Sequence, residues 1–216
     1  MTVLVATPPT KVELAKPMIE EALWRISVEQ YHQMIDAGIL TDDDPIELLE
    51  GLLVEKMSKN PPHSVVTGLL QDLLLRVIPA GWYLNAQEPV TTRDSEPEPD
   101  LAIVRGKRLD YLTHHPRPKD TTLVIEVADA TLRRDRGIKK RLYARAGIPI
   151  YWVVNLNQLQ IEVYSQPDQT ATVPDYRQPQ VYQALDQVPV ILDGVEVGQL
   201  LVSDVLPPQL ANQGEE

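Results

Sequence analysis

DLAIV (100–104), TLVIEV (122–127) and DRGIKKRLYARAG (135–147) are the three segments around which this 216-residue sequence is organised. The first two are short and apolar, as buried strands are, and they carry acidic residues at one end, Asp100 and Glu126. The third is basic and closes at a glycine, which is typical of a helix. Two carboxylates on neighbouring strands beside lysines favour a site for a divalent metal and a phosphate. The competing interpretation is that each acid is simply solvated at the end of its strand.

Upstream of these segments, the sequence predicts two helices, a hairpin and a strand. Ser27 and Gln30 have the form of a capping box, so we expect a helix that starts there and ends before Gly38. A hairpin should follow in IELLEGLLVEKM (46–57), with its central Glu-Gly pair at the turn. The remaining upstream predictions are a helix after the loop SKNPPH (58–63) and a strand in WYLNAQEPVTT (82–92).

Downstream, the basic segment predicts a helix from about Thr131 or Asp135 to Ala146. Further strands are expected in IYWVVNL (150–156), QIEVYS (160–165), VPVILDG (188–194) and VEVGQLLV (195–202). The alternation of helices and strands predicts an α/β (α+β) fold, a mixed β-sheet flanked by helices.

The composition fits one globular domain. We expect an N-terminal arm (1–26), a domain (27–206) and a C-terminal tail (207–216). The hydrophobic fraction of 43% is enough for a core, and the absence of cysteine excludes disulfides, thiolate metal sites and a cysteine nucleophile. No apolar run approaches the ~20 residues of a membrane span, so no membrane partner is expected. The opening MTVLVATPPTK is too short in apolar residues for a signal peptide, and the composition suits a cytoplasmic protein.

Charge is unevenly distributed along the chain. The net charge of −11 argues against a protein coated with basic residues for nucleic acid. Between Arg133 and Arg145, however, seven basic residues face the single acid Asp135, a local charge of +6. Such a patch is compatible with a polyanion, and the alternative is a solvated helix face that balances acidic neighbours.

The same segments suggest how a metal would be held. Mg²⁺ prefers oxygen ligands, which Asp100, Glu126 and the main-chain carbonyl of Val127 offer. A lysine nearby would orient the nucleophile and neutralise the phosphate. Three residues of the following helix, spaced four apart, share one face that could turn towards the acids: Asp135, Lys139 and Tyr143. Asp135 and Lys139 could equally form an ordinary surface pair.

A family resemblance sharpens these expectations. The run from PD (99–100) through LVIEV (123–127) to DxxxKxxxYARAGIPxYWVV (135–154) resembles the Uma-two family of proposed restriction endonucleases, within the PD-(D/E)XK, restriction-endonuclease-like superfamily. The match extends upstream to IELLEG (46–51) and His63. The resemblance implies a Mg (or Mn)-dependent nuclease core with DNA as substrate: a helix, three mainly antiparallel strands, a helix and a further strand.

The resemblance also assigns roles. Asp100 matches the PD aspartate and Glu126 the second acid, but Ala128 stands where the usual lysine would be, and the lysine role points to Lys139. Glu47 matches an upstream glutamate that could bind metal or support its ligands; the alternative is a partly exposed hairpin acid. Gln87 could touch the attacking water or the metal, or be an ordinary polar strand position. The residues expected on the DNA backbone are Arg133, Arg134, Arg136 and Lys140.

These observations lead to one principal function and an alternative from another class. The first is a metal-dependent DNA endonuclease in which Asp100 and Glu126 hold Mg²⁺ and Lys139 orients water and phosphate. The alternative is a catalytically inactive nuclease-fold protein that binds DNA or another protein.

We also expect a homodimer, whose interface the strands IYWVV and QIEVY could bury. His63 is expected to cap or pack its helix, with a place near the site as the alternative. Acyl transfer, nucleotide hydrolysis and glycoside hydrolysis find no support in the residue patterns.

Overall fold

The computed structural model describes residues 22–41 and 43–206. Most of the expected N-terminal arm (1–26) and the whole expected tail (207–216) lie outside the described residues.

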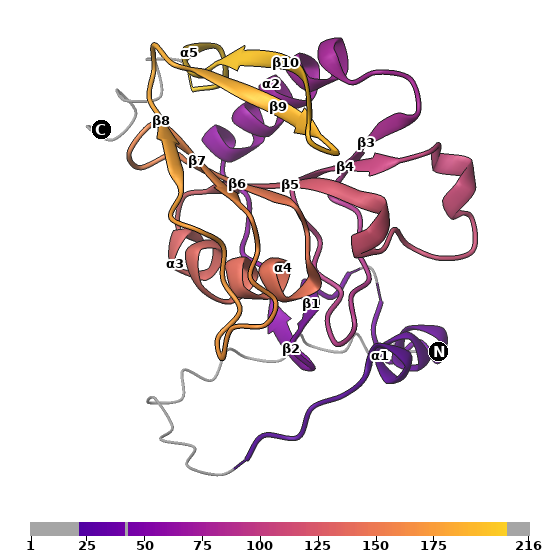
Figure 1. Ribbon diagram of the computed structural model, residues 1–216. Coiled ribbons are helices and arrows are strands. Elements are labelled where there is room, and N and C mark those ends of the chain that lie inside the picture. The colour runs from indigo at the N-terminus through magenta and orange to yellow at the C-terminus, as the bar shows by residue number, and fades with distance from the viewer. Residues whose placement is uncertain (1–21, 42, 207–216) are drawn as a thin grey trace, which may run out of the picture.

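A six-stranded mixed sheet forms the centre of the molecule (Figure 1). Its strands lie in the order β3-β4-β5-β6-β7-β8, and every neighbouring pair is antiparallel except β5 with β6. A helical crossover joins that parallel pair, as parallel neighbours require. The strands are β3 (Trp82–Ala86), β4 (Leu101–Arg105), β5 (Thr121–Ala128), β6 (Ile150–Asn155), β7 (Gln160–Ser165) and β8 (Gln180–Tyr182). The prediction of a mixed sheet with helices is confirmed.

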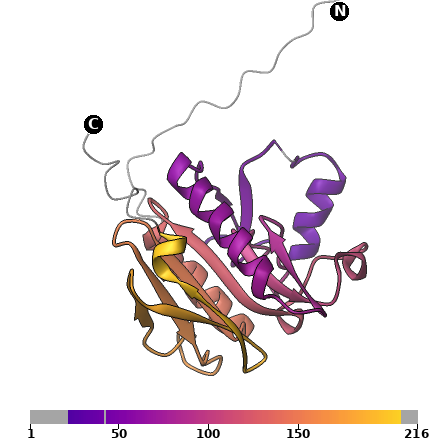
Figure 2. The same cartoon turned by 90° about the horizontal axis from the view of Figure 1, so that it is seen from above.

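Different layers cover the two faces of this sheet (Figures 1 and 2). One face packs against α2 (Pro61–Val77) and the hairpin of β9 (Gln187–Leu192) and β10 (Val195–Leu201), with the short α5 (Val202–Val205) beside them. The crossover between β5 and β6 covers the other face. It consists of α3 (Leu132–Arg134), a π-helical turn (Asp135–Lys139) and α4 (Lys140–Ala146).

Alternation along β5 decides which face each side chain joins. Ile125 and Val127 belong to the apolar cluster beneath α2, whereas Val124 and Ala128 belong to the cluster beneath α4. Because successive strand residues point to opposite faces, Glu126 lies on the α4 face. The chain therefore directs one acidic side chain of a fully buried strand towards the basic crossover helix.

The N-terminal elements frame this face. The helix α1 (Val28–Asp36) begins with the expected capping box, and the hairpin of β1 (Ile46–Leu49) and β2 (Leu52–Glu55) turns at Glu50 and Gly51. Both turn residues have positive φ, 50° and 76°. A Cβ atom on Gly51 would lie 2.7 Å from Cβ of Arg25, so glycine is required there twice over, by backbone conformation and by contact.

Two expectations need correction, those for the strand over 82–92 and for the strands of the dimer interface. The strand predicted over 82–92 stops at Ala86, because Gln87 takes a positive φ of 57° and turns the chain away. The long loop after β4 contains two 3₁₀ turns, Arg108–Tyr111 and Pro118–Asp120. Moreover, β6 lies between β5 and β7, and β7 between β6 and β8, so the strands proposed for a dimer interface are interior. Within residues 22–41 and 43–206, no helix has the length and apolar character needed to cross a bilayer.

Candidate active site

The two acids singled out in the sequence lie side by side. Leu101 on β4 pairs with Ile125 on β5, which places the preceding Asp100 beside the following Glu126. The main-chain N–H of Val127 donates a hydrogen bond of 2.9 Å to Oδ2 of Asp100 across the two strands. Both carboxylates line one small cavity of about 80 Å³, together with Glu47, Asp135 and Lys139. We call this cavity the acidic pocket.

Lys139 reaches the acidic pocket from the crossover helix. Its Nζ lies 2.9 Å from Oε1 of Glu126 and 3.5 Å from Oε2 of Glu47. The hydroxyl of Tyr143, one turn further along the helix, donates to the same Oε1 of Glu126 at 2.8 Å. The expected shared helix face is therefore present and turned towards the acids. The amine comes from a position 13 residues after Glu126, while Ala128 is fully buried on the strand itself.

A widened turn marks the part of this helix that lines the pocket. The N–H of Lys140 donates to the carbonyl of Asp135, five residues earlier, which is the spacing of a π-helix. The sequence predicted one regular helix over this region and gave no signal for the wider turn. Single π turns within helices are frequent at functional sites. Here the turn carries two buried charged residues, Asp135 and Lys139, into the pocket.

Glu47 and Asp135 add to the acidity of the pocket. Glu47 on β1 is only 2% exposed, so the alternative of a partly exposed hairpin acid is wrong. Its Oε2 accepts a hydrogen bond from the N–H of Glu98 at 3.3 Å. Asp135 is equally buried, and its Oδ2 has no hydrogen-bond partner among the described residues. It is therefore not a surface partner of Lys139.

The pocket holds more carboxylate than its own cations neutralise. Burial raises the pKa of Glu126 to about 8; Asp135, Asp100 and Glu47 add to this shift, and Lys139 opposes it. Burial likewise raises the pKa of Asp135 to about 6. Carboxyl groups in such a state are stabilised when a further positive charge is supplied.

Lys139 remains charged in this environment. Burial alone would lower the pKa of its amine, but Glu126, Glu47 and Asp135 outweigh burial and hold the pKa above its usual range. The side chain is therefore suited to placing a positive charge and donating hydrogen bonds. It is not suited to accept a proton as a general base.

His63 and Lys59 also line the acidic pocket: for His63 this is the alternative that the sequence left open, whereas Lys59 was not singled out. Nε2 of His63 lies 3.0 Å from Oδ2 of Asp100, and Nζ of Lys59 lies 3.7 Å from Oδ1 of the same residue. Burial acts to raise the pKa of Asp100, but hydrogen bonds from His63 and from the N–H of Val127 lower it below the usual value. The helix cap expected of His63 is supplied by Asn60, whose side chain accepts from the N–H of His63.

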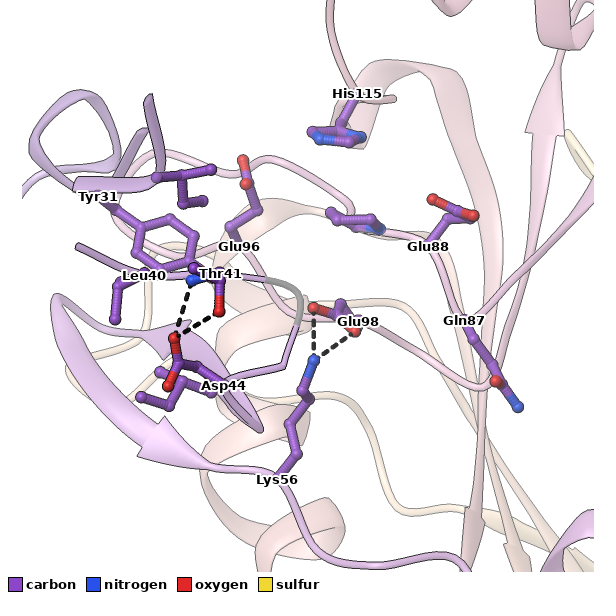
Figure 3. A pocket seen from close by; sticks show the side chains of 13 residues that line it. Tyr31, Leu40, Thr41, Asp44, Lys56, Gln87, Glu88, Glu96, Glu98 and His115 are labelled. Atoms are coloured by element: carbon purple, nitrogen blue, oxygen red, sulfur yellow. Dashed lines mark hydrogen bonds and ion pairs between the residues drawn. The ribbon is translucent and has the colours of Figure 1, made fainter. Parts of the chain in front are cut away.

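Gln87 lies at the outer edge of the acidic pocket. It is exposed, and its main-chain N–H donates to the carbonyl of Asp100 at 3.1 Å. With Lys56 and Glu98, it also lines a larger adjoining pocket of about 490 Å³, shown in Figure 3. Lys56 and Glu98 form an ion pair of 2.9 Å, and both residues line both pockets. Further acids, Glu88 and Glu96, line the larger pocket and make that side negative.

The basic residues of the crossover helix are mostly paired with acids from other elements. Arg136 binds Glu162, and Lys140 binds Asp175 at 2.8 Å. Arg134 donates to the carbonyl of Glu55 and approaches Glu47 at 3.7 Å. Two further arginines of this helix follow the same pattern, Arg141 on Glu50 and Arg145 on Glu50 and Asp94. Arg133 is exposed.

Within the described ranges, 22–41 and 43–206, no group of three or more acidic or histidine side chains converges in the manner of a closed metal cage. Asp100 and Glu126 share the acidic pocket with other carboxylates that do not converge with them on one point. Mg²⁺ usually takes only one or two carboxylates from the protein, whereas structural zinc takes four ligands.

Comparison with known families identifies the chain. The sequence profile of the Uma2 family, described as "Putative restriction endonuclease", matches residues 28–201. The chain belongs to the Uma2 family. The match contains every residue of the acidic pocket and confirms the resemblance seen in the sequence. No curated protein matches the chain at a significant level.

A solved structure supports the fold of this Uma2 protein. The crystal structure of a "putative nuclease belonging to DUF820" from Anabaena variabilis ATCC 29413 matches with a TM-score of 0.63 and 15% sequence identity. The match covers 83% of this chain and 97% of the other. At this identity the likeness concerns the fold alone, and it confirms the predicted mixed sheet of a nuclease-like protein.

Proposed function

We propose that this Uma2 protein is a Mg²⁺-dependent DNA endonuclease that hydrolyses phosphodiester bonds at the acidic pocket. The observation that carries the proposal is the arrangement of Asp100 and Glu126 on adjacent strands with Nζ of Lys139 2.9 Å from Glu126. Family membership supports a nuclease. The pocket supports the choice of residues, because two acids and a fixed ammonium are what metal-assisted phosphoryl chemistry requires.

The donors of the pocket fit Mg²⁺ or Mn²⁺. Oδ2 of Asp100 accepts two hydrogen bonds, whereas the contact found for Oδ1 within residues 22–41 and 43–206 is with Lys59, at 3.7 Å. Glu126 has a raised pKa, and among the same residues Oδ2 of Asp135 is buried without a hydrogen-bond partner. We assign Asp100 and Glu126 as the metal ligands, with the carbonyl of Val127 as a third oxygen donor. Asp135 and Glu47 would add negative charge around them.

Each protein group then has a defined task in hydrolysis. When bound, Mg²⁺ would lower the pKa of a coordinated water and offset charge that develops on the phosphate. Lys139 contributes a fixed positive charge that holds the attacking water and a phosphate oxygen. Tyr143 holds Glu126 in place through its hydrogen bond of 2.8 Å, and Glu47 holds Lys139 through the contact at 3.5 Å. The oxygen of the water forms a bond to phosphorus as the bond to the leaving ester oxygen breaks. The proton lost by the attacking water passes to solvent, and solvent protonates the leaving oxygen.

The charges around the pocket suggest the side from which DNA approaches. The larger pocket beside Gln87 is lined by several acids, which would repel phosphates. Lys59 and Arg134 line the acidic pocket but not the larger one, and the exposed Arg133 directly precedes Arg134 in the chain. We propose that these three bind the DNA backbone without reading sequence. Arg136 and Lys140 would contribute less, because acids of this chain already bind them.

The expected homodimer remains part of the proposal, because two copies of the site are the simplest way to cut both strands of a duplex. Its interface must use a surface other than β6 and β7, which are interior.

The alternative function, a DNA-binding protein with this fold that does not cleave, gains some support from the contacts that already occupy Lys139. Cleavage assays separate the two.

The test is plasmid nicking by the purified protein with Mg²⁺, Mn²⁺ or a chelator. We expect metal-dependent nicking by the wild type and its loss in Asp100→Asn and Lys139→Met. Asp193→Asn is the matched control, because Asp193 is an exposed acid paired with Arg105 and lies away from the pocket. A folded wild type that binds DNA but never nicks it, with either metal, would rule out the endonuclease in favour of the binding protein.

A further inference from the structure

His63 occupies a fixed place between α2 and the acidic pocket. It lies in the first turn of α2, where Asn60 caps the helix and accepts from the N–H of His63 at 3.0 Å. One turn later, the hydroxyl of Thr67 donates to the carbonyl of His63 at 2.9 Å. The main chain of His63 is thus held on both sides, and the imidazole projects into the wall of the pocket.

The imidazole has one contact that defines its orientation. Its Nε2 lies 3.0 Å from Oδ2 of Asp100. Its Nδ1 is buried and has no hydrogen-bond partner within residues 22–41 and 43–206. A proton on Nδ1 would therefore be a buried donor without an acceptor, which is unfavourable. The proton on Nε2 is therefore the one that donates to Oδ2 of Asp100.

The two oxygens of Asp100 consequently differ. Oδ2 accepts from both His63 and the N–H of Val127, at 3.0 and 2.9 Å. In the described part of the chain, the cation nearest to Oδ1 is the amine of Lys59, at 3.7 Å, which is longer than a hydrogen bond, and Lys59 is 40% exposed. A carboxylate held through one oxygen presents the other in a defined direction.

We propose that His63 is a positioning residue for the metal ligand Asp100: it fixes Oδ2 so that Oδ1 is presented to a divalent cation. The inference rests on the proposed function and adds a residue to it. Groups that orient metal ligands contribute to affinity because a free ligand must otherwise be ordered when the metal binds. His63 acts through Asp100 and touches neither metal nor phosphate.

The test compares Mn²⁺ binding by calorimetry in the wild type, His63→Leu and His63→Gln. Removal of a ligand's supporting hydrogen bond typically weakens metal binding about 10- to 100-fold, and we expect this loss in His63→Leu. His63→Gln should recover most of the affinity, because its amide N–H can reach the same oxygen. In nicking assays, His63→Leu should require more Mg²⁺ for half-maximal rate while kcat at saturating Mg²⁺ changes little.

Ser64→Ala is the matched control, because it removes a side-chain hydrogen bond from the same first turn of α2 without touching Asp100 or His63. It should leave Mn²⁺ binding as in the wild type. Folded His63→Leu that binds Mn²⁺ as the wild type does would overturn the role of His63 and leave the nuclease proposal standing. A wild type that binds no metal would overturn both. If His63→Leu does not fold, His63→Asn replaces it, since its amide is too short for the contact.

Discussion

Two buried glutamates on the same sheet have opposite electrostatic environments. Glu126 on β5 and Glu162 on β7 are 4% and 2% exposed, and both lie next to basic residues of the crossover helix. Burial raises the pKa of Glu126 to about 8, and neighbouring acids add to the shift. Burial also acts on Glu162, but hydrogen bonds from Arg136, Asn155 and other donors lower its pKa to about 2. The exposed fraction of the residue alone therefore does not distinguish Glu126 from Glu162.

The difference lies in the partners. Around Glu162, the guanidinium of Arg136 donates through Nε at 2.9 Å, and Asn155 and Tyr164 donate at 3.1 and 2.8 Å. These donors from the same chain stabilise the negative charge of Glu162, so we interpret this residue as a structural one. Around Glu126, the single ammonium of Lys139 serves several acids. Perturbed pKa values of this kind cluster at functional sites. Under the proposed function, a bound cation would offset the unneutralised charge of these acids.

The largest expected difference between the two glutamates is in activity. Glu126→Gln should reduce the rate of plasmid nicking by at least about 10³-fold, because loss of a metal ligand removes several kcal/mol of transition-state stabilisation. Glu162→Gln, with the same chemical change, should retain nicking in protein that is folded. The rates are measured at saturating Mg²⁺ at a temperature where both variants are native. Equal losses in the two variants would mean that the acidic pocket is not the site of cleavage.

The next difference should appear in the response of stability to metal. At a Mn²⁺ concentration 100 times Kd, binding to the native state alone stabilises by about 2.7 kcal/mol. Urea unfolding with and without Mn²⁺ should show this increment in the wild type and in Glu162→Gln. Asp100→Asn should not show it. An increment that persists in Asp100→Asn would place the cation elsewhere on the molecule.

A smaller effect is expected in how the free energy of unfolding depends on pH when Glu162 is replaced. The folded pKa of Glu162 is about 2, below its ordinary value of 4.5, so its carboxylate stabilises the fold above pH 4.5 and loses that contribution as pH falls towards 2. We expect Glu162→Gln to be about 1–3 kcal/mol less stable than the wild type at pH 7, and the gap to shrink below pH 4. Denaturant unfolding at several pH values measures the gap. A gap that does not depend on pH would assign the effect to packing.

The sequence was sufficient to predict the acids and the strands that carry them. Short apolar runs placed Asp100 and Glu126 at the ends of buried strands, and spacing by four placed Asp135, Lys139 and Tyr143 on one helix face. Each pattern lies within one short segment, so it can be read from a single sequence without knowledge of the fold. The family resemblance then supplied the displaced lysine, which no local pattern could assign.

Contacts between distant segments could not be predicted in this way. His63 and Asp100 are 37 residues apart, and only the packing of α2 on the sheet brings them together. The pairing of Arg136 with Glu162 has the same origin, over 26 residues. The run of basic residues left two interpretations open, a patch for a polyanion and a helix face that balances acidic neighbours. The ion pairs favour the second for most of the run, with acidic partners from β7 and other elements. A count of charges in one segment does not show which of them are already neutralised.

The smallest expected effect tests which basic residues remain available for DNA. Arg133 is exposed, whereas Lys140 forms an ion pair with Asp175 at 2.8 Å. Each phosphate contact contributes about one unit to the slope of log K against log salt concentration. Arg133→Ala should therefore lower that slope by about one, and Lys140→Ala should leave it unchanged while costing at most about 1 kcal/mol of stability. Fluorescence anisotropy with a labelled duplex between 50 and 200 mM salt measures both, and a reduced slope in Lys140→Ala would show that DNA displaces Asp175. In that case the acids around the crossover helix would act as competitors of the phosphates, and the contrast between satisfied and unsatisfied charges would hold only in the absence of DNA.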